Sequence, residues 1–407
     1  MGLFTKLSKW MSVRRGVTSG PSSLTAIPIP SQGRMVDSGS AFKITAFYAG
    51  VRLIAENVAS LPKGIRKYTP DGPVDASDKR VFSLINSRPN SYTNAFDFWN
   101  VITTLVYGWG NAYAYIQRGG DGAPVALHQL HPSWVDVKMV SGKKKYKVLA
   151  TDPDFSWLNG VYDDDDMLHF MLVTFDGIKG INPVIYNALA LCKSRSTEEF
   201  GAEFYEKGGN IRAVMEVDGE MGDDDYEKFM AHFKATSNNF ETPLLEYGIK
   251  YKQLSVNPVA AQLVQSETMS LQDIARILNV PPHMIGELSH ATFSNIEHQT
   301  IQFVQYTLRP IVKRFEVEME SKLFFSSEVG KYDIKFVLDG LLRGDTAARS
   351  AYYHNAILDG YMSRNEVREL EGLQHKDGLD NMLFPLNSGL VDEKGEIVGA
   401  QGADKNE

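Results

Sequence analysis

Four consecutive aspartates, Asp163-Asp164-Asp165-Asp166, suggest metal chemistry, because carboxylates are the ligands that hard cations prefer. Consecutive carboxylates in a loop cannot all converge on one ion, and no EF-hand spacing follows them. A solvated acidic turn before a strand explains the run more simply. A metal-dependent nuclease or hydrolase that uses the Asp163–Asp166 site stays open as an alternative.

The other residue types that could do chemistry are scattered. The nine histidines form no HExxH pair, and the chain has neither a Walker A lysine loop nor a G-x-S-x-G elbow. The single cysteine, Cys192, excludes an internal disulfide framework and lies in an apolar helical pattern typical of a buried thiol. We therefore expect no catalytic residue, no metal, no cofactor and no enzyme activity.

The charge balance argues against tight binding of nucleic acid. The 407 residues include 42 basic and 50 acidic side chains, a formal net charge of −8. Proteins that grip phosphates usually have a basic domain, so any contact with DNA is expected to be local or loose. No apolar run approaches the roughly 18 residues that span a bilayer, and no signal-peptide core is present, so we expect no membrane contact.

Residues 40–181 predict a unit of helices and mostly antiparallel strands. Ser40 is expected to cap a first helix, and a second is expected at 94–107. The glycine turn at 119–122 predicts a hairpin between alternating strands. A late strand at 333–338 must join a sheet made earlier in sequence. Residues 1–39, which are basic before Asp37, are expected to be a flexible arm.

The pattern changes after Asn182. One long helix is predicted from Pro183 to Lys207, with a narrow apolar stripe that suits packing against other helices. The stripe consists of Ile185, Leu189, Cys192, Ser196, Phe200 and Phe204. Residues 210–257 predict a small β-α-β-β module with too little core of its own, in which Asp223-Asp224-Asp225 marks a helix start.

The segment from Leu271 to Pro310 holds a loop between two strong helices. Pro281-Pro282 must end the first helix, because proline removes amide donors and clashes with the preceding turn. Ser294 to Glu297 forms a capping-box pattern that starts the next helix, which Pro310 should kink. A second capping box begins at Ser363, and the tail after Asn387 is expected to be disordered.

Short tags along residues 40–385 carry a resemblance by their order and spacing. They are Gly110-Asn111-Ala112-Tyr113-Ala114-Tyr115-Ile116; Leu130-His131-Pro132 with Trp134-Val135; Ile274-Ala275-Arg276 with Val280-Pro281-Pro282 and Ile285-Gly286; Phe293-Ser294-Asn295-Ile296-Glu297 with Leu308-Arg309-Pro310; Leu342-Arg343-Gly344-Asp345; and residues 360–368. Together they resemble the portal proteins, or head-to-tail connectors, of tailed double-stranded DNA bacteriophages, in the siphovirus-type form.

The resemblance implies an elongated α+β subunit that assembles as a ring of twelve around a channel. Its expected parts are an α/β wing, a two-helix stem, a small α/β clip, a tunnel loop, a long kinked helix and a helical crown. In order, these are the arm 1–39, wing 40–181, stem helix 182–209, clip 210–257, stem helix 258–282, tunnel loop 283–294, kinked helix and wing strand 295–344, crown 345–387 and tail 388–407.

The implied function is a gateway for DNA packaging and ejection at one capsid vertex of the virion, assembled in the host cytoplasm. Expected partners are further copies of the chain, double-stranded DNA in transit without sequence specificity, the terminase large subunit, a head–tail adaptor, the major capsid protein and a scaffold. Another ring-forming phage structural protein remains the alternative within this class.

The resemblance also implies three sets of site residues. The tunnel-loop residues expected near DNA are His290, Ala291, Thr292, Phe293, Ser294 and Asn295. The basic residues that are candidates for lining the channel are Lys193, Arg195 and Lys207. The docking surface of the clip is expected at Asp223, Asp224, Asp225, Tyr226, Asn238 and Asn239.

Overall fold

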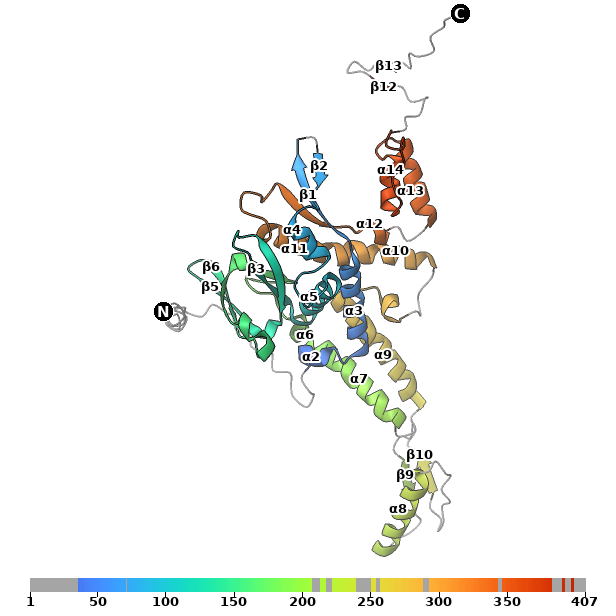
Figure 1. The fold of residues 1–407 in the computed structure, drawn as a ribbon. Coiled ribbons are helices and arrows are strands. Elements are labelled where there is room, and N and C mark those ends of the chain that lie inside the picture. The colour runs from blue at the N-terminus through green and yellow to red at the C-terminus, as the bar shows by residue number, and fades with distance from the viewer. Residues whose placement is uncertain are drawn as a thin grey trace, which may run out of the picture.

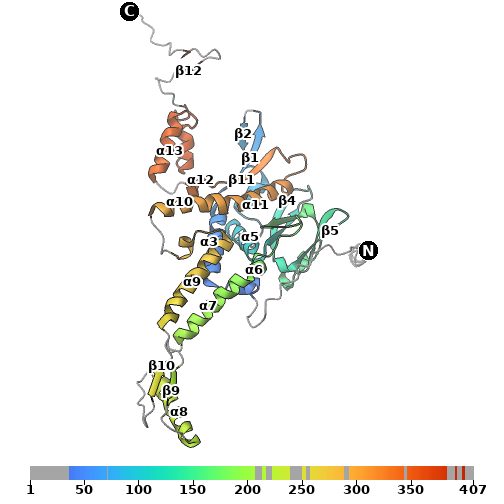
Figure 2. The same ribbon diagram turned by 180° about the vertical axis from the view of Figure 1, so that it is seen from behind.

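The chain is elongated, with a broad wing, a two-helix stem and a small insert at the far end of the stem (Figures 1 and 2). The computed structural model describes residues 36–70, 72–206, 213–216, 222–238, 250–253, 257–287, 293–342, 346–382, 390–391 and 397–398. Helices pack against sheets whose strand pairs in the wing are antiparallel, so the α+β class is confirmed. No helix in the described ranges is long and apolar enough to cross a membrane.

Four helices lie in the first part of the wing, and the last of them carries the fully buried Trp99. The indole Nε1 of Trp99 donates to the Ile85 carbonyl at 2.9 Å. The fold begins before residue 40, because Val36 is buried and Asp37 forms a capping box with Ser40. Ser40, expected to cap the main helix, therefore belongs to a one-turn helix instead. These helices are α2 (Ser38–Ala41), α3 (Thr45–Ser60), α4 (Arg80–Asn86) and α5 (Ala95–Trp109).

Two three-stranded antiparallel sheets form the outer half of the wing. The predicted hairpin is confirmed, with Ala114 opposite Gln129, and a third strand places Leu168 on the other side of Ala114. Tyr146 from the second sheet packs with Tyr113 of the first in a separate core. The first sheet contains β3 (Asn111–Arg118), β4 (Pro124–Leu130) and β8 (Met167–Met171); the second contains β5 (Val135–Val140), β6 (Lys143–Val148) and β7 (Gly160–Asp163).

The late strand joins an early one, as predicted. β11 (Tyr332–Phe336) lies antiparallel to β1 (Lys63–Thr69), which also pairs with β2 (Gly72–Asp75). Ile65 and Ile334 are opposite one another and fully buried. This pairing joins segments more than 260 residues apart, since Arg66 and Asp333 are 267 positions apart in sequence.

A long helix crosses the wing and changes its winding before a proline. It consists of α10 (Phe293–Phe303), a π-helical turn at Val304–Leu308 and α11 (Arg309–Lys322). Pro310 has no amide hydrogen, so it leaves the carbonyl four residues earlier without its helical donor. The side-chain amide of Asn279 donates to that carbonyl, on Tyr306, at 3.0 Å. The predicted irregularity at Pro310 is thus a π-turn.

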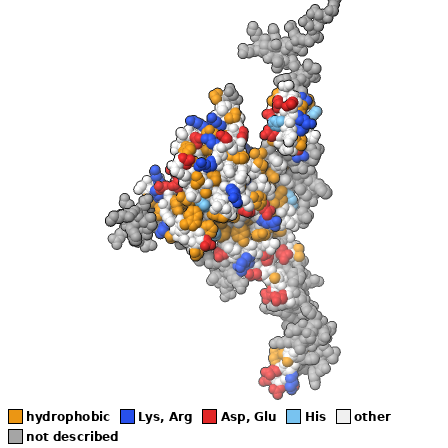
Figure 3. Space-filling model, viewed as in Figure 1, with side chains coloured by type: hydrophobic (Ala, Val, Ile, Leu, Met, Phe, Trp, Pro, Cys, Tyr) orange, Lys and Arg blue, Asp and Glu red, His pale blue; other side chains and the backbone are white. Residues whose placement is uncertain are grey.

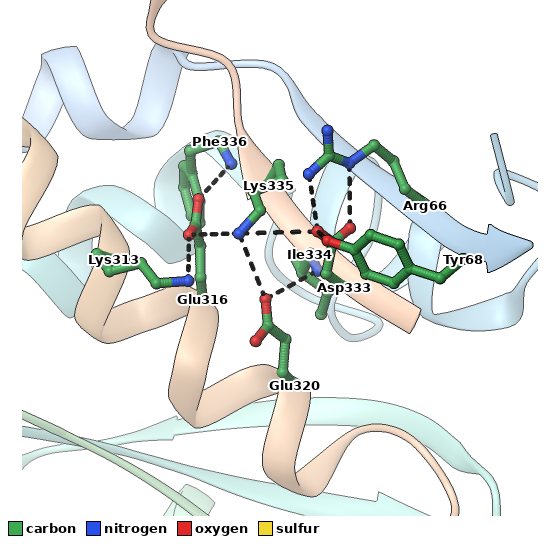
Figure 4. A network of polar contacts seen from close by, with 9 residues as sticks. All are labelled: Arg66, Tyr68, Lys313, Glu316, Glu320, Asp333, Ile334, Lys335 and Phe336. Carbon is green, nitrogen blue, oxygen red and sulfur yellow. Dashed lines mark hydrogen bonds and ion pairs between the residues drawn. The ribbon is translucent and has the colours of Figure 1, made fainter. Parts of the chain in front are cut away.

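Glutamates of α11 satisfy backbone amides at the edges of two sheets. Glu316 accepts from the amide of Phe336 at 2.9 Å, and Glu320 from that of Ile334 at 3.2 Å. On the other side of the helix, Glu318 accepts from the amide of His169 on β8 at 2.8 Å. Figure 4 shows Glu316 and Glu320 pointing from the helix to β11. The helix therefore covers strand edges that would otherwise be open.

The stem contains two antiparallel helices, and its first helix differs from the prediction. Asn187 interrupts the expected rod, which gives α6 (Pro183–Tyr186) and α7 (Ala188–Glu206); α9 (Asn257–Leu278) packs beside α7. Within the expected stripe, Ile185, Leu189 and Phe200 are exposed in the single subunit, whereas Cys192 packs against the core. The buried face instead carries Leu191, Ser194 and Gly201. Small side chains let the helices approach closely, and periodicity of large residues does not reveal them.

The insert and the C-terminal helices lie at opposite ends of the molecule (Figure 1). In the insert, β9 (Ala213–Glu216) pairs with β10 (Lys250–Gln253) beside α8 (Asp223–Asn238). The other end contains α12 (Asp339–Leu342), α13 (Thr346–Leu358) and α14 (Arg364–Leu370). Within the tail expected to be disordered, β12 (Leu390–Val391) pairs with β13 (Ile397–Val398).

Candidate functional site

The junction between wing and stem is held by two adjacent residues at the start of β3. Gly110 ends α5 with a φ of 77°, and a Cβ there would lie 1.9 Å from the Ile181 carbonyl oxygen. The buried side chain of Asn111 donates to the Gly180 carbonyl at 2.8 Å and accepts from the Gly180 amide at 2.7 Å. The segment that enters the stem at Asn182 is therefore fixed to the wing at Gly110-Asn111.

A buried histidine lies next to this clamp. His169 is 3% exposed, stacks on Tyr113, and its Nε2 lies 3.0 Å from the Asn111 side-chain oxygen. Its Nδ1 lies 3.3 Å from the Tyr146 hydroxyl. Burial, with a smaller effect from Lys144, Lys322 and Lys179, holds the pKa of His169 well below 6.5. The imidazole is therefore neutral in the folded protein at neutral pH.

As pH falls below 6.5, the imidazole of His169 takes up a proton in the unfolded chain but stays neutral in the folded chain. Acid therefore favours the unfolded state, and the fold loses stability. We expect this residue to lower the free energy of unfolding by about 1.4 kcal/mol per pH unit below that point. Urea unfolding between pH 7.5 and 5.5 should show a smaller slope for His169→Gln. The exposed His375→Gln serves as the control and should keep the slope of the parent. Equal slopes for the parent and His169→Gln would contradict the prediction.

The acidic run Asp163–Asp166 has structural partners. Asp164 accepts from the buried Lys322 at 3.0 Å and from the Tyr146 hydroxyl at 3.1 Å, and Asp166 pairs with Arg118 at 3.1 Å. Asp163 pairs with Lys145. Among the residues described, no three His, Cys, Asp or Glu side chains come together in a way that could hold a metal ion. These aspartates connect α11 to the outer sheets, which gives the metal-site alternative no support.

A second junction lies where α9 ends. Asn279 adopts a left-handed conformation with a φ of 55° and ends the helix. Its side-chain amide donates to the Thr307 hydroxyl at 3.2 Å, while that hydroxyl donates to the Asn279 carbonyl. Pro281-Pro282 follow as predicted, and residues 282–285 form a 3-10 turn that buries Ile285. The first residues of the expected tunnel loop are therefore packed against the wing.

The structure describes only part of the expected tunnel loop. His290, Ala291 and Thr292 lie outside the described residues. Phe293, Ser294 and Asn295 form the first turn of α10, which begins two residues before the expected start at Asn295, and their side chains are also outside the description. Before this segment, His283 Nδ1 lies 2.6 Å from the Gln299 side-chain oxygen, which ties the turn to α10.

Two of the three expected basic residues of the stem, Lys193 and Arg195, are paired with carboxylates of the same chain. Lys193 lies 3.7 Å from Asp273 on α9, and Arg195 lies 2.9 Å from Glu199 one turn along α7. Lys207 lies outside the described residues. These ion pairs reduce the positive charge that Lys193 and Arg195 could offer to DNA phosphates.

The expected docking surface falls on α8. Asp223, Asp224 and Asp225 form its first turn and are exposed, as is Tyr226. Figure 3 shows acidic side chains at this far tip of the molecule. Asn238 is the last residue of α8, its side chain is outside the description, and Asn239 lies outside the described residues.

The fold recurs in solved structures of a GTA particle neck and of a phage portal protein. A subunit in the neck of an empty GTA particle, computed with C6 symmetry, superposes with a TM-score of 0.59 at 20% identity, covering 84% of this chain and 96% of that one. An HK97-family phage portal protein from Corynebacterium diphtheriae gives 0.55 at 14% identity, covering 77% and 99%. The architecture is thus that of portal subunits.

The sequence comparisons identify the family. The phage portal protein model matches residues 45–372, so the chain belongs to the phage portal protein family. The portal protein of Enterobacteria phage HK97 is 27% identical over 393 residues, 93% of this chain and 91% of its own. The probable portal protein of Streptomyces phage phiC31 is 27% identical over 391 residues, 92% of this chain and 85% of its own.

Proposed function

We propose that the chain is the subunit of a ring at one capsid vertex, and that the channel of this ring carries double-stranded DNA during packaging and ejection. The proposal depends mainly on the family match over residues 45–372, which includes the stem, the insert, nearly all of the wing and the helices α12, α13 and α14. The proposed parts keep the expected boundaries, with the tunnel loop at 283–294. We further propose that the major capsid protein and a scaffold surround the ring, which assembles in the host cytoplasm.

Exposed apolar residues on the stem support assembly with further copies. Leu189 is 72% exposed, and Ile185 and Phe200 are also exposed on α6 and α7. Apolar residues on a helix face are normally covered in the working assembly. A ring uses a heterologous interface, in which this face of one subunit meets a different face of the next.

The net negative charge of the stem helices supports a channel through which DNA slides without being held. Helix α7 carries two basic and four acidic side chains and α9 one basic and two acidic, which leaves a formal charge of −3. DNA carries about one negative charge per 1.7 Å of its axis, so a basic wall would hold it and an acidic wall would not. We propose that the tunnel loop around His290 is the part of the subunit that contacts DNA. The exposed acidic turn of α8 suits docking by the terminase large subunit and later by a head–tail adaptor.

Replacing Leu189 by lysine tests the ring. Since this side chain is largely exposed, the subunit should fold with unchanged thermal stability. Burying the new charge against a neighbour should abolish assembly, so light scattering should show monomers where the parent forms rings of about twelve. Leu189→Met, which keeps volume and apolar character, is the matched control and should assemble. A monomeric parent at high concentration, or rings of Leu189→Lys, would count against the proposal.

Deleting His290, Ala291 and Thr292 tests the tunnel loop. The deletion leaves the 3-10 turn and α10 intact, so rings should still form. If the loop narrows the channel, packaging or genome retention should fail in phage carrying the deletion. Genome content of purified particles measures this directly. Normal phage yield from the deletion would remove the tunnel-loop assignment while leaving the ring proposal untouched.

A further inference from the structure

Four large apolar side chains form an exposed patch where the stem begins. Phe175 precedes α6, Ile185 and Tyr186 lie on α6, and Leu189 lies in the first turn of α7. They are 50 to 72% exposed, and the rings of Phe175 and Tyr186 pack with their centroids 5.9 Å apart. These four residues are called the stem patch. An apolar surface of this kind marks a site where another molecule binds.

A groove of about 420 Å³ lies between the end of α9 and the long helix that crosses the wing. Its floor is apolar and includes Ala275, Val280 and Phe303, which are 2 to 4% exposed. Polar side chains form its rim, namely Gln272, Arg276, Gln299, Gln302 and Tyr306. An apolar floor inside a polar rim is the usual construction of a protein–protein interface. The groove therefore suits an apolar side chain of another protein.

The stem patch and the groove lie on opposite sides of the two-helix stem. A helix turns by about 100° per residue, so Leu189 lies about 140° around α7 from Ser194, which is buried beside α9. On α9, Gln272 and Arg276 lie about 160° and 120° around the helix from Ser270, which is buried beside α7. Each surface is therefore turned away from the other stem helix of its own chain.

The two surfaces also lie at the same level along the stem. Helices α7 and α9 run antiparallel side by side (Figures 1 and 2), and Lys193 pairs with Asp273 across them. Because both helices rise equally per residue, Leu189 is level with Ile277, between two residues of the groove lining. A rotation about an axis that runs along the stem leaves every atom at its own level. Such a rotation therefore brings the patch of one copy to the groove of the next.

We propose that the stem patch of one copy docks into the groove of the next copy, with Leu189 as the side chain that enters the groove. The inference rests on the proposed ring and names the second of the two faces that a heterologous interface requires. An apolar anchor in a desolvated pocket contributes most of the binding energy of such a contact. Because the groove includes Pro281 and Pro282, the anchor would contact the turn that precedes the proposed tunnel loop.

Cross-linking of cysteine pairs in the full chain tests the docking. Rings of the double variant Leu189→Cys with Gln302→Cys are treated with a short thiol-specific cross-linker and separated on a denaturing gel. Both positions are exposed in the single subunit, so the variant should fold. We expect a ladder of linked chains up to the full ring. The matched control, Leu189→Cys with the exposed Val161→Cys on β7, should give single chains, as should the parent, which contains Cys192.

The possible results of the cross-linking separate the docking from the ring itself. Rings of the double variant that give no ladder would overturn the docking and leave the proposed ring standing. Linked pairs from Leu189→Cys alone would show two stem patches in contact with each other, which also overturns it. A parent that forms no rings would remove the docking together with the proposed function.

Mixing two assembly-deficient variants gives a second readout. Leu189→Lys has a charged patch and an intact groove, whereas Gln302→Lys has an intact patch and a charged groove. Each variant alone should be monomeric, because assembly would bury the new charge against an apolar surface. In an equal mixture one intact contact remains, so light scattering should show about a twofold rise in molar mass and no larger species. A mixture that stays monomeric, or rings of Gln302→Lys alone, would overturn the proposal.

Discussion

Replacing Gly110 by alanine is expected to destabilise the chain by about 4 kcal/mol or more, which is the range of the most damaging single substitutions. The φ of 77° at Gly110 costs an L-residue roughly 1–2 kcal/mol. The larger part comes from the new Cβ, which would lie 1.9 Å from the Ile181 carbonyl oxygen and 2.6 Å from its carbon. These atoms are backbone, so neither can rotate away, and the chain entering the stem has to move.

Gly120→Ala is the matched control for this prediction. Gly120 lies in the turn that follows β3, the strand that begins next to Gly110, and a Cβ on Gly120 would meet nothing within 4 Å. We expect urea unfolding to show a change within about 0.5 kcal/mol for this variant. A Gly110→Ala protein as stable as Gly120→Ala would mean that the wing and stem are not clamped at this point.

Local sequence signals were the most reliable guides to the fold. The capping box at Ser363 and Glu366 is present, and glycines end the two helices beside it, with a φ of 74° at Gly360 and 68° at Gly372. The late strand was predictable because its alternation leaves one face that only an earlier sheet can cover. Such signals depend on a few adjacent residues whose chemistry acts within one turn or strand.

The rotation of the stem helix could not be predicted in the same way. The periodicity of large side chains favoured a buried stripe through Leu189 and Phe200, yet both are exposed in the single subunit. The α7–α9 seam is built on Ser194, Gly201 and Ser270, whose small size allows close approach. A hydrophobic pattern cannot distinguish a face that packs within the chain from one available to another copy.

Most contacts of the candidate site could not be predicted from the sequence. Asn111 was noted only as part of a short tag, and its role depends on Gly180, 69 positions away. Asn279 similarly depends on the carbonyl that Pro310 leaves free on Tyr306. The resemblance to a known family predicted the architecture. The residues that join the wing to the stem could be identified only in the folded structure. The assignment of His290 and its neighbours to the channel stays a prediction.

The second large effect is expected at Glu316, because its buried carboxylate serves three partners at once. It accepts from the Phe336 amide at 2.9 Å and from Lys313 and Lys335 at 3.2 and 3.4 Å (Figure 4). Glu316→Ala leaves a buried amide unsatisfied and removes a carboxylate partner from both lysines, so we expect the free energy of unfolding to fall by about 3 kcal/mol. Val317→Ala, an exposed neighbour on the same helix, should stay within about 0.5 kcal/mol.

Hydrogen exchange can show which part of the fold loses stability in the Glu316→Ala variant. Arg66 and Tyr68 hold Asp333 at 2.7 and 2.8 Å, and Glu320 accepts from the Ile334 amide at 3.2 Å, so β11 has polar attachments besides the one to Glu316 (Figure 4). Without Glu316 the attachment at Asp333 remains, and the strand should open from its Phe336 end. Exchange at the Phe336 amide should therefore rise far more than at Arg66. Uniform acceleration across the wing would instead indicate global destabilisation, and α11 would then be a general core helix that does not specifically anchor the late strand.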